Sequence, residues 1–112
     1  MAPQLSLSAA ASRDIRKILR HSSRTFGADQ RLIQQALKRI AEEPLCIGSK
    51  PCEEIRGELR SLHIARAATR QSATAHVIYY SAAKLGENWS VTVIRVLHDR
   101  MDPELHIANE DD

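Results

Sequence analysis

The stretch VIRVLHDRMDPELH, residues 93–106, begins as an apolar β-strand and ends in a dense run of polar and charged side chains. The strand carries Arg95 in its middle, reaches His98, and cannot continue as a strand past Pro103. Its polar end is either a catalytic lip at the edge of a sheet or a clasp that closes a small fold. The clasp is favoured because a paired, structural histidine is commoner than a catalytic one. His98 would then donate to a backbone carbonyl.

In the clasp interpretation, an arginine of this stretch pairs with a nearby carboxylate. The cation is Arg95 or Arg100. The carboxylate is Asp102 or, on the first predicted helix, Asp14. Met101 would fill an apolar gap, because its flexible side chain adapts to irregular spaces.

The first half of the chain has the periodicity of one short strand and two helices. Residues 4–8 alternate apolar and polar, and Ser8 can cap the helix predicted for residues 9–24. Gly27 fits the turn after that helix, and a second amphipathic helix is predicted for residues 29–43, which ends before a proline. A short turn between two helices predicts an antiparallel helical hairpin.

After an irregular segment the period changes to two, which predicts strands at residues 59–68, 75–82 and 89–97. The polar links between them suit hairpin turns. The predicted fold is α+β with the order β-α-α-β-β-β, a small antiparallel sheet with a helical hairpin on one face. The first strand must take an edge of the sheet, and the last strand, apolar on both faces, must be central.

The length of 112 residues predicts a single domain, 1–112, with a core over residues 5–106 and an acidic tail at 107–112. The net charge is only +2, yet eight Lys/Arg lie within residues 13–39 and five acids lie within 102–112. This asymmetry favours a charged partner for the first half, or simply solvated outer helix faces.

Several classes of protein and of site are not expected from the residue pattern. The chain has no apolar run of about 20 residues for a membrane helix and no secretory signal, so a cytoplasmic location is expected. Cys46 and Cys52 match no zinc or CxxC redox spacing, and they are expected to be reduced loop residues, with a disulfide as the alternative. The histidines show no ligand spacing, so neither a metal nor a cofactor is expected.

A set of short motifs runs in order along nearly the whole chain. They are Leu7, Ser8, Ala11, Asp14, Ile15 and Ile18, then Phe26-Gly27, AEEP at 41–44, Gly48, Ile55-Arg56-Gly57, Leu59-Arg60, HVIYY at 76–80, and IRVLHDRMDP at 94–103. In this order they resemble the ParE branch of the RelE/ParE family of bacterial toxins. The resemblance implies a small toxin that inhibits DNA gyrase without catalysis and is neutralised by a ParD-type antitoxin, so that DNA is contacted only through gyrase or the antitoxin. RelE relatives on the same fold instead cleave mRNA on the ribosome.

A gyrase inhibitor would act through a binding surface, and such surfaces use arginine and aromatic anchors. The expected target-binding residues are Arg60, Arg66, Arg95, His98, Arg100 and Met101, with Arg70 as a further candidate. If the protein is instead a ribonuclease, the catalytic residues are Arg60, Arg95 and His98, together with Tyr80. A third possibility is an inactive binding module that keeps only its partner.

The antitoxin is expected to add a strand at the short first strand and a helix along the helical hairpin. For these side chains the alternative is packing in the core. The expected contact residues are Leu5, Leu7, Leu19, Arg20, Phe26 and Leu37.

Overall fold

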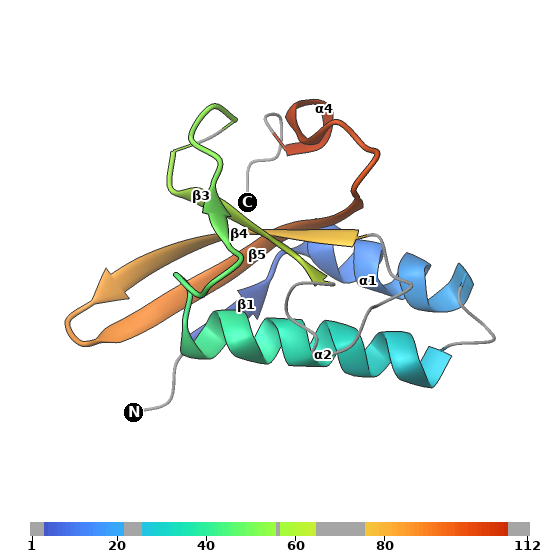
Figure 1. Cartoon of the computed structure of the whole chain (residues 1–112), viewed down its shortest axis with the longest axis horizontal. Helices are drawn as coiled ribbons and strands as arrows, with labels where there is room; N and C mark the ends of the chain where they lie inside the picture. Colours follow the sequence, from blue (N-terminus) through green and yellow to red (C-terminus); the bar gives the residue numbers. More distant parts are fainter. Residues whose placement is uncertain (1–3, 22–25, 56, 65–75, 108–112) are drawn as a thin grey trace.

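The computed structural model describes residues 4–21, 26–55, 57–64 and 76–107, which form one sheet, a pair of longer helices and a short C-terminal helix (Figure 1). The predicted α+β class and the β-α-α-β-β-β order are confirmed, and the sequence did not predict β2 and α4. In chain order, the elements are β1 Gln4–Leu7, α1 Ala9–His21, α2 Phe26–Glu42, β2 Lys50–Pro51, β3 Leu59–His63, β4 His76–Leu85, β5 Asn88–His98 and α4 Pro103–Ile107.

The sheet has the strand order β1-β5-β4-β3-β2. β1 lies at one edge and β5 is an interior strand, as predicted. The expectation of a purely antiparallel sheet is wrong, because β1 runs parallel to β5 while the other neighbours are antiparallel. A parallel pair needs a long connection, and the helical hairpin together with β2, β3 and β4 provides it.

The boundary between the two long helices differs from the prediction. Gly27 was expected in the turn and residue 29 at the helix start, but α2 already begins at Phe26. A glycine inside a helix costs about 1 kcal/mol relative to alanine. Burial of Ile33 and Ile40 against the sheet outweighs this cost. The predicted end of the first helix at residue 24 and the predicted end of the strand 59–68 lie outside the described residues.

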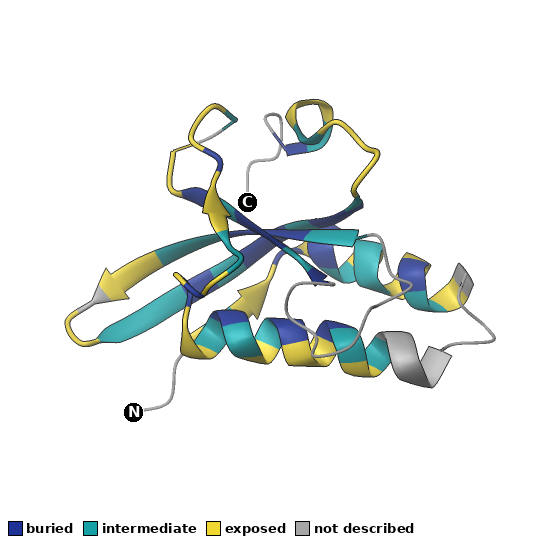
Figure 2. Ribbon diagram, viewed as in Figure 1, coloured by how far each residue is buried: buried dark blue, intermediate teal, exposed yellow. Residues whose placement is uncertain are grey.

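The two faces of the sheet carry separate cores. The buried residues lie in the middle of the sheet and along the two long helices (Figure 2). The helix-side core packs Leu62, Ile78 and Tyr80 of the strands against α1 and α2. The second core lies on the other face and includes Tyr79, which packs with Cys52, Leu59, Ile94, Leu97 and Ile107. Ile107 of α4 is fully buried there, so the ordered fold extends one residue past the predicted start of the tail.

Both cysteines are free and buried, one in each core. Cys46 belongs to the helix-side core and Cys52 to the second core, so the sheet separates the two thiols. Both are loop residues, as predicted, and both side chains are buried in a core.

A β-bulge changes the alternation of β5 near its middle. Tyr79 pairs with Arg95 and Tyr80 pairs with Val93, so Ile94 is an extra residue on β5. Before the bulge, Val93 packs in the helix-side core, and after it Val96 does so. The bulge therefore re-aims the second half of β5 without losing the apolar side chains of either face.

Ser8 joins the start of α1 to β5, as well as capping the helix as predicted. Its Oγ accepts a hydrogen bond from the Ala11 N–H at 3.0 Å and donates to the Ile94 carbonyl at 2.7 Å. Its own N–H donates to the Val93 carbonyl at 2.9 Å. The helix therefore starts in a fixed position beside the bulge.

No helix in the described ranges is long and apolar enough to cross a membrane.

Candidate functional site

The clasp predicted for residues 93–106 exists, with Arg95 as the cation and Asp14 of α1 as the carboxylate. The guanidinium donates from Nε to Asp14 Oδ2 at 2.7 Å and from Nη2 to Oδ1 at 3.0 Å, a bidentate arrangement. Only 17% of the Arg95 side chain and 12% of the Asp14 side chain are exposed. Partial burial weakens the competition from water and strengthens this pair.

Asp14 also takes the place of a missing strand partner. β1 pairs with β5 only up to Val93, so the edge of β5 is open beyond that point. There the Val96 N–H donates to Asp14 Oδ2 at 3.0 Å. The Ile94 carbonyl, two residues earlier on the same edge, accepts a hydrogen bond from the Ser8 hydroxyl. Arg95 Nη1 donates to the His106 carbonyl at 3.2 Å, which ties α4 to the same point.

Other details of the predicted clasp are wrong. Met101 is 46% exposed and fills no gap, and Arg100 is exposed and does not pair with Asp102. His98 Nδ1 accepts the Arg100 N–H at 3.1 Å and does not donate to a carbonyl. The reason is a tight turn after β5, where the Met101 N–H donates to the His98 carbonyl and directs these side chains outward. Asp102 instead accepts the Glu104 N–H at 3.0 Å at the start of α4.

His63 and His98 contact the Asp99 carboxylate at the ends of β3 and β5, and His76 of β4 packs against His98. Asp99 Oδ2 lies 3.3 Å from His63 Nε2, and Asp99 Oδ1 lies 3.2 Å from His98 Nδ1. The His76 and His98 rings pack edge to face with centroids 5.3 Å apart. Among the described residues no three His, Cys, Asp or Glu side chains are grouped so that they could hold a metal ion. The cluster holds strand ends together.

The residues expected to be catalytic in a ribonuclease do not converge on one pocket. Arg95 and His98 line a pocket of about 690 Å³ at the end of β5, together with Lys17 and Met101. Arg60 is not among its lining residues, and donates from Nη2 to Ser49 Oγ at 2.8 Å. Tyr80 is fully buried and donates to the Pro44 carbonyl. Burial is the main cause that raises the pKa of Tyr80 above its ordinary value.

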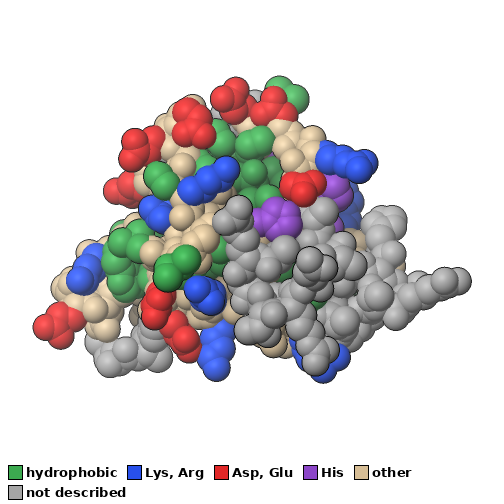
Figure 3. Space-filling model, viewed as in Figure 1, with side chains coloured by type: hydrophobic (Ala, Val, Ile, Leu, Met, Phe, Trp, Pro, Cys, Tyr) green, Lys and Arg blue, Asp and Glu red, His purple; other side chains and the backbone are tan. Residues whose placement is uncertain are grey.

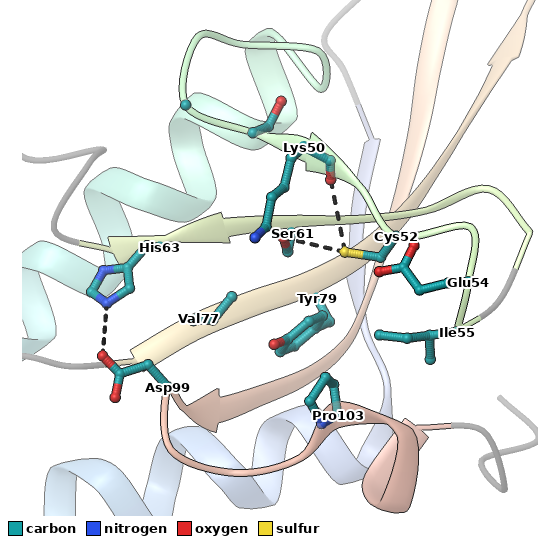
Figure 4. Close-up of a pocket in the computed structure, with 12 residues that line it drawn as sticks. Lys50, Cys52, Glu54, Ile55, Ser61, His63, Val77, Tyr79, Asp99 and Pro103 are labelled. Atoms are coloured by element: carbon teal, nitrogen blue, oxygen red, sulfur yellow. Dashed lines mark hydrogen bonds and ion pairs between the residues drawn. The ribbon is translucent and has the colours of Figure 1, made fainter.

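A second pocket, which we call the sheet-face pocket, lies on the face opposite the long helices (Figure 4). Its volume is about 550 Å³, and Val77 and Tyr79 of β4 form its floor. Lys50, Glu54 and Asp99 line it with charged side chains. The sequence did not reveal this site, because Lys50 and Glu54 lie in the irregular segment 44–58, whose path no periodicity predicts.

The environment of Tyr79 in this pocket is electronegative. Burial raises the pKa of its hydroxyl, and the charges of Cys52, Asp102 and Asp99 raise the pKa further. Tyr79 therefore keeps its proton over a wider pH range than a solvated tyrosine, and its hydroxyl can serve as a hydrogen-bond donor or acceptor.

Of the expected antitoxin-binding residues, Leu5, Leu19 and Leu37 are partly buried against the helix-side core. Leu7 is 41% exposed on β1, and Arg20 is exposed on α1. The Phe26 side chain lies outside the part of the chain that the structure describes, and so do Arg66 and Arg70 of the expected target-binding set. The antitoxin and target roles of all these residues stay predictions.

Comparisons with known proteins agree with the fold. A family model described as the ParE toxin of the type II toxin–antitoxin system parDE matches residues 5–103. Toxin ParE1 of Mycobacterium tuberculosis, strains CDC 1551/Oshkosh and H37Rv, is 32% identical over 112 residues, covering 96% of this chain and 100% of the relative. A solved YoeB/ParE toxin from Agrobacterium tumefaciens superposes with a TM-score of 0.60 at 16% identity, covering 85% of this chain and 97% of that chain, a likeness of fold alone.

The clasp can be tested by separating its charge pairing from its contact with β5. Asp14→Asn keeps an oxygen for the Val96 N–H but leaves the guanidinium of Arg95 unpaired in a partly buried site. We expect a loss of about 3 kcal/mol in the free energy of unfolding, measured with urea. Combining Asp14→Asn with Arg95→Met should cost less than the sum of the two single changes, by about 1.5 kcal/mol.

The matched control is Asp102→Asn, at an exposed position that retains a capping oxygen. It should leave the free energy of unfolding unchanged. Additive effects of the two clasp substitutions would contradict the pairing described here.

Proposed function

The chain belongs to the family of ParE toxins of type II toxin–antitoxin systems, and we propose that it arrests growth by binding and inhibiting DNA gyrase, without catalysing a reaction, until a ParD-type antitoxin neutralises it. In this proposal it is a single-domain cytoplasmic toxin that meets DNA only indirectly, through gyrase or through the antitoxin. Such a protein needs binding surfaces and no catalytic residues or cofactor.

The observation that carries the proposal is the charge of the sheet-face pocket. Glu54 and Asp99 line it, against Lys50 as the one fixed cation among its lining residues. Figure 3 shows acidic side chains over the surrounding loop and α4, and the exposed acids there are Glu53, Glu54, Glu58, Asp102 and Glu104. An RNA phosphate would be repelled from this face, since phosphate binding depends on neutralisation by Lys and Arg.

The target-binding surface that we propose centres on the turn after β5. Arg100 is exposed and Met101 is 46% exposed, and His98 lies beside them. An exposed methionine next to an arginine is suited to a protein interface, where both residue types are enriched. Because Arg95 is paired with Asp14, it would contribute to target binding by fixing the shape of this turn, and not by direct contact. Arg60 and Arg66 remain in the proposed surface because arginine is a frequent anchor of protein interfaces.

The antitoxin is proposed to cover β1 and the helical hairpin. β1 has one neighbour in the sheet, so its other side is free to pair with an added strand. Leu5, Leu7, Leu19, Leu37 and Phe26 are the proposed apolar contacts, with Arg20 at their margin. The exposed basic residues of α1 suit an acidic antitoxin segment, and they are Arg13, Arg16, Lys17 and Arg20.

The second candidate function is a ribosome-dependent mRNA endonuclease that uses Arg60, Arg95 and His98. It is supported by the place of Arg95 and His98 in one pocket at the end of β5. The engagement of Arg95 by Asp14 and the separate position of Arg60 favour the binding function instead. A third candidate is an inactive binding module, which would bind an antitoxin but would not arrest growth.

The proposal predicts the outcome of two parallel assays with purified protein. Supercoiling of relaxed plasmid by gyrase should be lost at stoichiometric toxin, while mRNA on translating ribosomes should stay intact. Replacing Arg100 and Met101 together by alanine should weaken gyrase inhibition about tenfold or more, because these are the exposed arginine and apolar anchor.

The matched control for that variant is Leu105→Ala, since Leu105 is 73% exposed on the neighbouring α4. It should inhibit gyrase like the unmodified protein. Cleaved mRNA with unaffected gyrase would establish the endonuclease, and absence of both effects together with absence of growth arrest would establish the inactive module.

The antitoxin surface predicts the effect of a charge at its centre. Leu19→Asp should weaken binding of the cognate antitoxin at least tenfold in a calorimetric titration, because an unpaired carboxylate would replace an apolar contact. Leu105→Asp places the same charge on α4, outside the proposed antitoxin surface, and should leave the affinity unchanged. Equal affinities for the two variants, both shown to be folded by circular dichroism, would reject this placement of the antitoxin.

A further inference from the structure

Tyr79 is a buried polar residue with an unused hydroxyl. It is 7% exposed and lies on the floor of the sheet-face pocket. Its hydroxyl makes no hydrogen bond in the structure of the described residues. Figure 4 shows the hydroxyl turned toward the side of the pocket where Asp99 lies, and away from Ile55. The hydroxyl is not among the fully buried polar atoms that lack a partner, so it is open to the pocket, where a ligand can form a hydrogen bond with it.

The charged side chains around the Tyr79 hydroxyl determine which charge a ligand of this pocket should carry. Asp99 and Glu54 line the pocket, and Asp99 keeps free acceptor capacity, because a carboxylate offers about four lone-pair sites. His63 lies beside one of its oxygens and is charged only when protonated, while Nδ1 of His98, beside the other oxygen, accepts the Arg100 N–H. Lys50 is the opposing charge. A cation with several N–H donors fits this set of groups, and a phosphate does not.

The shape of the pocket favours a long, flat cation over a compact one. Val77, the Tyr79 ring and Pro103 present apolar surface beside the carboxylate of Asp99 (Figure 4). The arginine side chain matches this pattern, since it has an apolar stem and a planar head with five N–H donors. Its head can stack on an aromatic ring as well as donate.

We propose that the sheet-face pocket binds an arginine side chain of a partner protein's peptide segment. The guanidinium donates to Asp99 and to the Tyr79 hydroxyl, and the stem of the arginine packs on Val77 and Pro103. Glu54 attracts the segment from the rim. Asp99 lies in the turn that carries the proposed gyrase surface, but Arg100 and Met101 do not line the pocket, so the peptide titration tests this site apart from gyrase inhibition.

The test uses the full chain and two capped tripeptides, Ac-Leu-Arg-Leu-NH2 and its citrulline analogue, in an NMR titration. Citrulline keeps the shape of arginine but carries no charge. The arginine peptide should shift the amide signals of Val77, Tyr79 and Asp99. The citrulline peptide should bind about tenfold more weakly, the factor expected for loss of one charge-assisted hydrogen bond.

Substitutions of residues that line the pocket test whether the peptide binds there. Tyr79→Phe keeps the ring and should weaken the arginine peptide about fivefold, as one hydrogen bond is lost. Glu54→Gln, at an exposed loop position that leaves the fold intact, should also weaken it. Lys50→Gln should strengthen it, since it removes the opposing charge. Glu42→Gln, at an exposed position on α2, is the matched control and should change nothing.

Three results would overturn the proposal. One is equal affinity for the arginine and citrulline peptides. Another is a set of signal shifts confined to the helices. The third is binding of a single-stranded oligoribonucleotide in the pocket that displaces the arginine peptide, which would mean that the site accepts phosphate despite its carboxylates.

Discussion

The fold depends on the carboxylate of Asp14 at the open edge of β5. β1 is too short to cover this edge, and an uncovered edge strand would expose unpaired backbone groups. Asp14 accepts the Val96 N–H and two hydrogen bonds from Nε and Nη2 of Arg95, and Nη1 of Arg95 donates to the His106 carbonyl. One side chain therefore joins α1, β5 and α4. An apolar residue at position 14 could make none of these contacts.

This arrangement gives the molecule two unlike sides. The long helices cover one face of the sheet and present exposed basic residues, while α4 and the loop after β2 are the parts of the described chain that cover the other face (Figure 1). The incomplete cover leaves the sheet-face pocket, where Tyr79 lies next to carboxylates. A ParE toxin has to engage at least one partner, and two surfaces of opposite charge allow it to engage partners of opposite charge. The proposed antitoxin surface includes the helix side, and the proposed arginine site lies on the other face.

Local patterns predicted the parts of the structure that depend on neighbours in sequence. The alternation before Ser8 and the helical stripe after it predicted β1, the cap and α1, because capping and amphipathicity are local properties. The pairing of Arg95 was predicted only as a choice among carboxylates, since Asp14 lies 81 residues away in sequence. The bulge at Ile94 and the turn that exposes Met101 were missed, because both depend on register between strands. The sheet-face pocket combines an irregular loop with three strands and carries no local signal.

Hydrogen exchange at the Val96 amide tests most directly whether Asp14 acts as the missing strand partner. The comparison is between the unmodified protein and Asp14→Ala, with the Ile78 amide in the neighbouring strand β4 as the internal reference. We predict that Val96 is protected in the unmodified protein and that the substitution lowers its protection far more than that of Ile78. An equal loss at both amides would contradict this role, because it would show that Asp14 adds to global stability without holding the edge of β5.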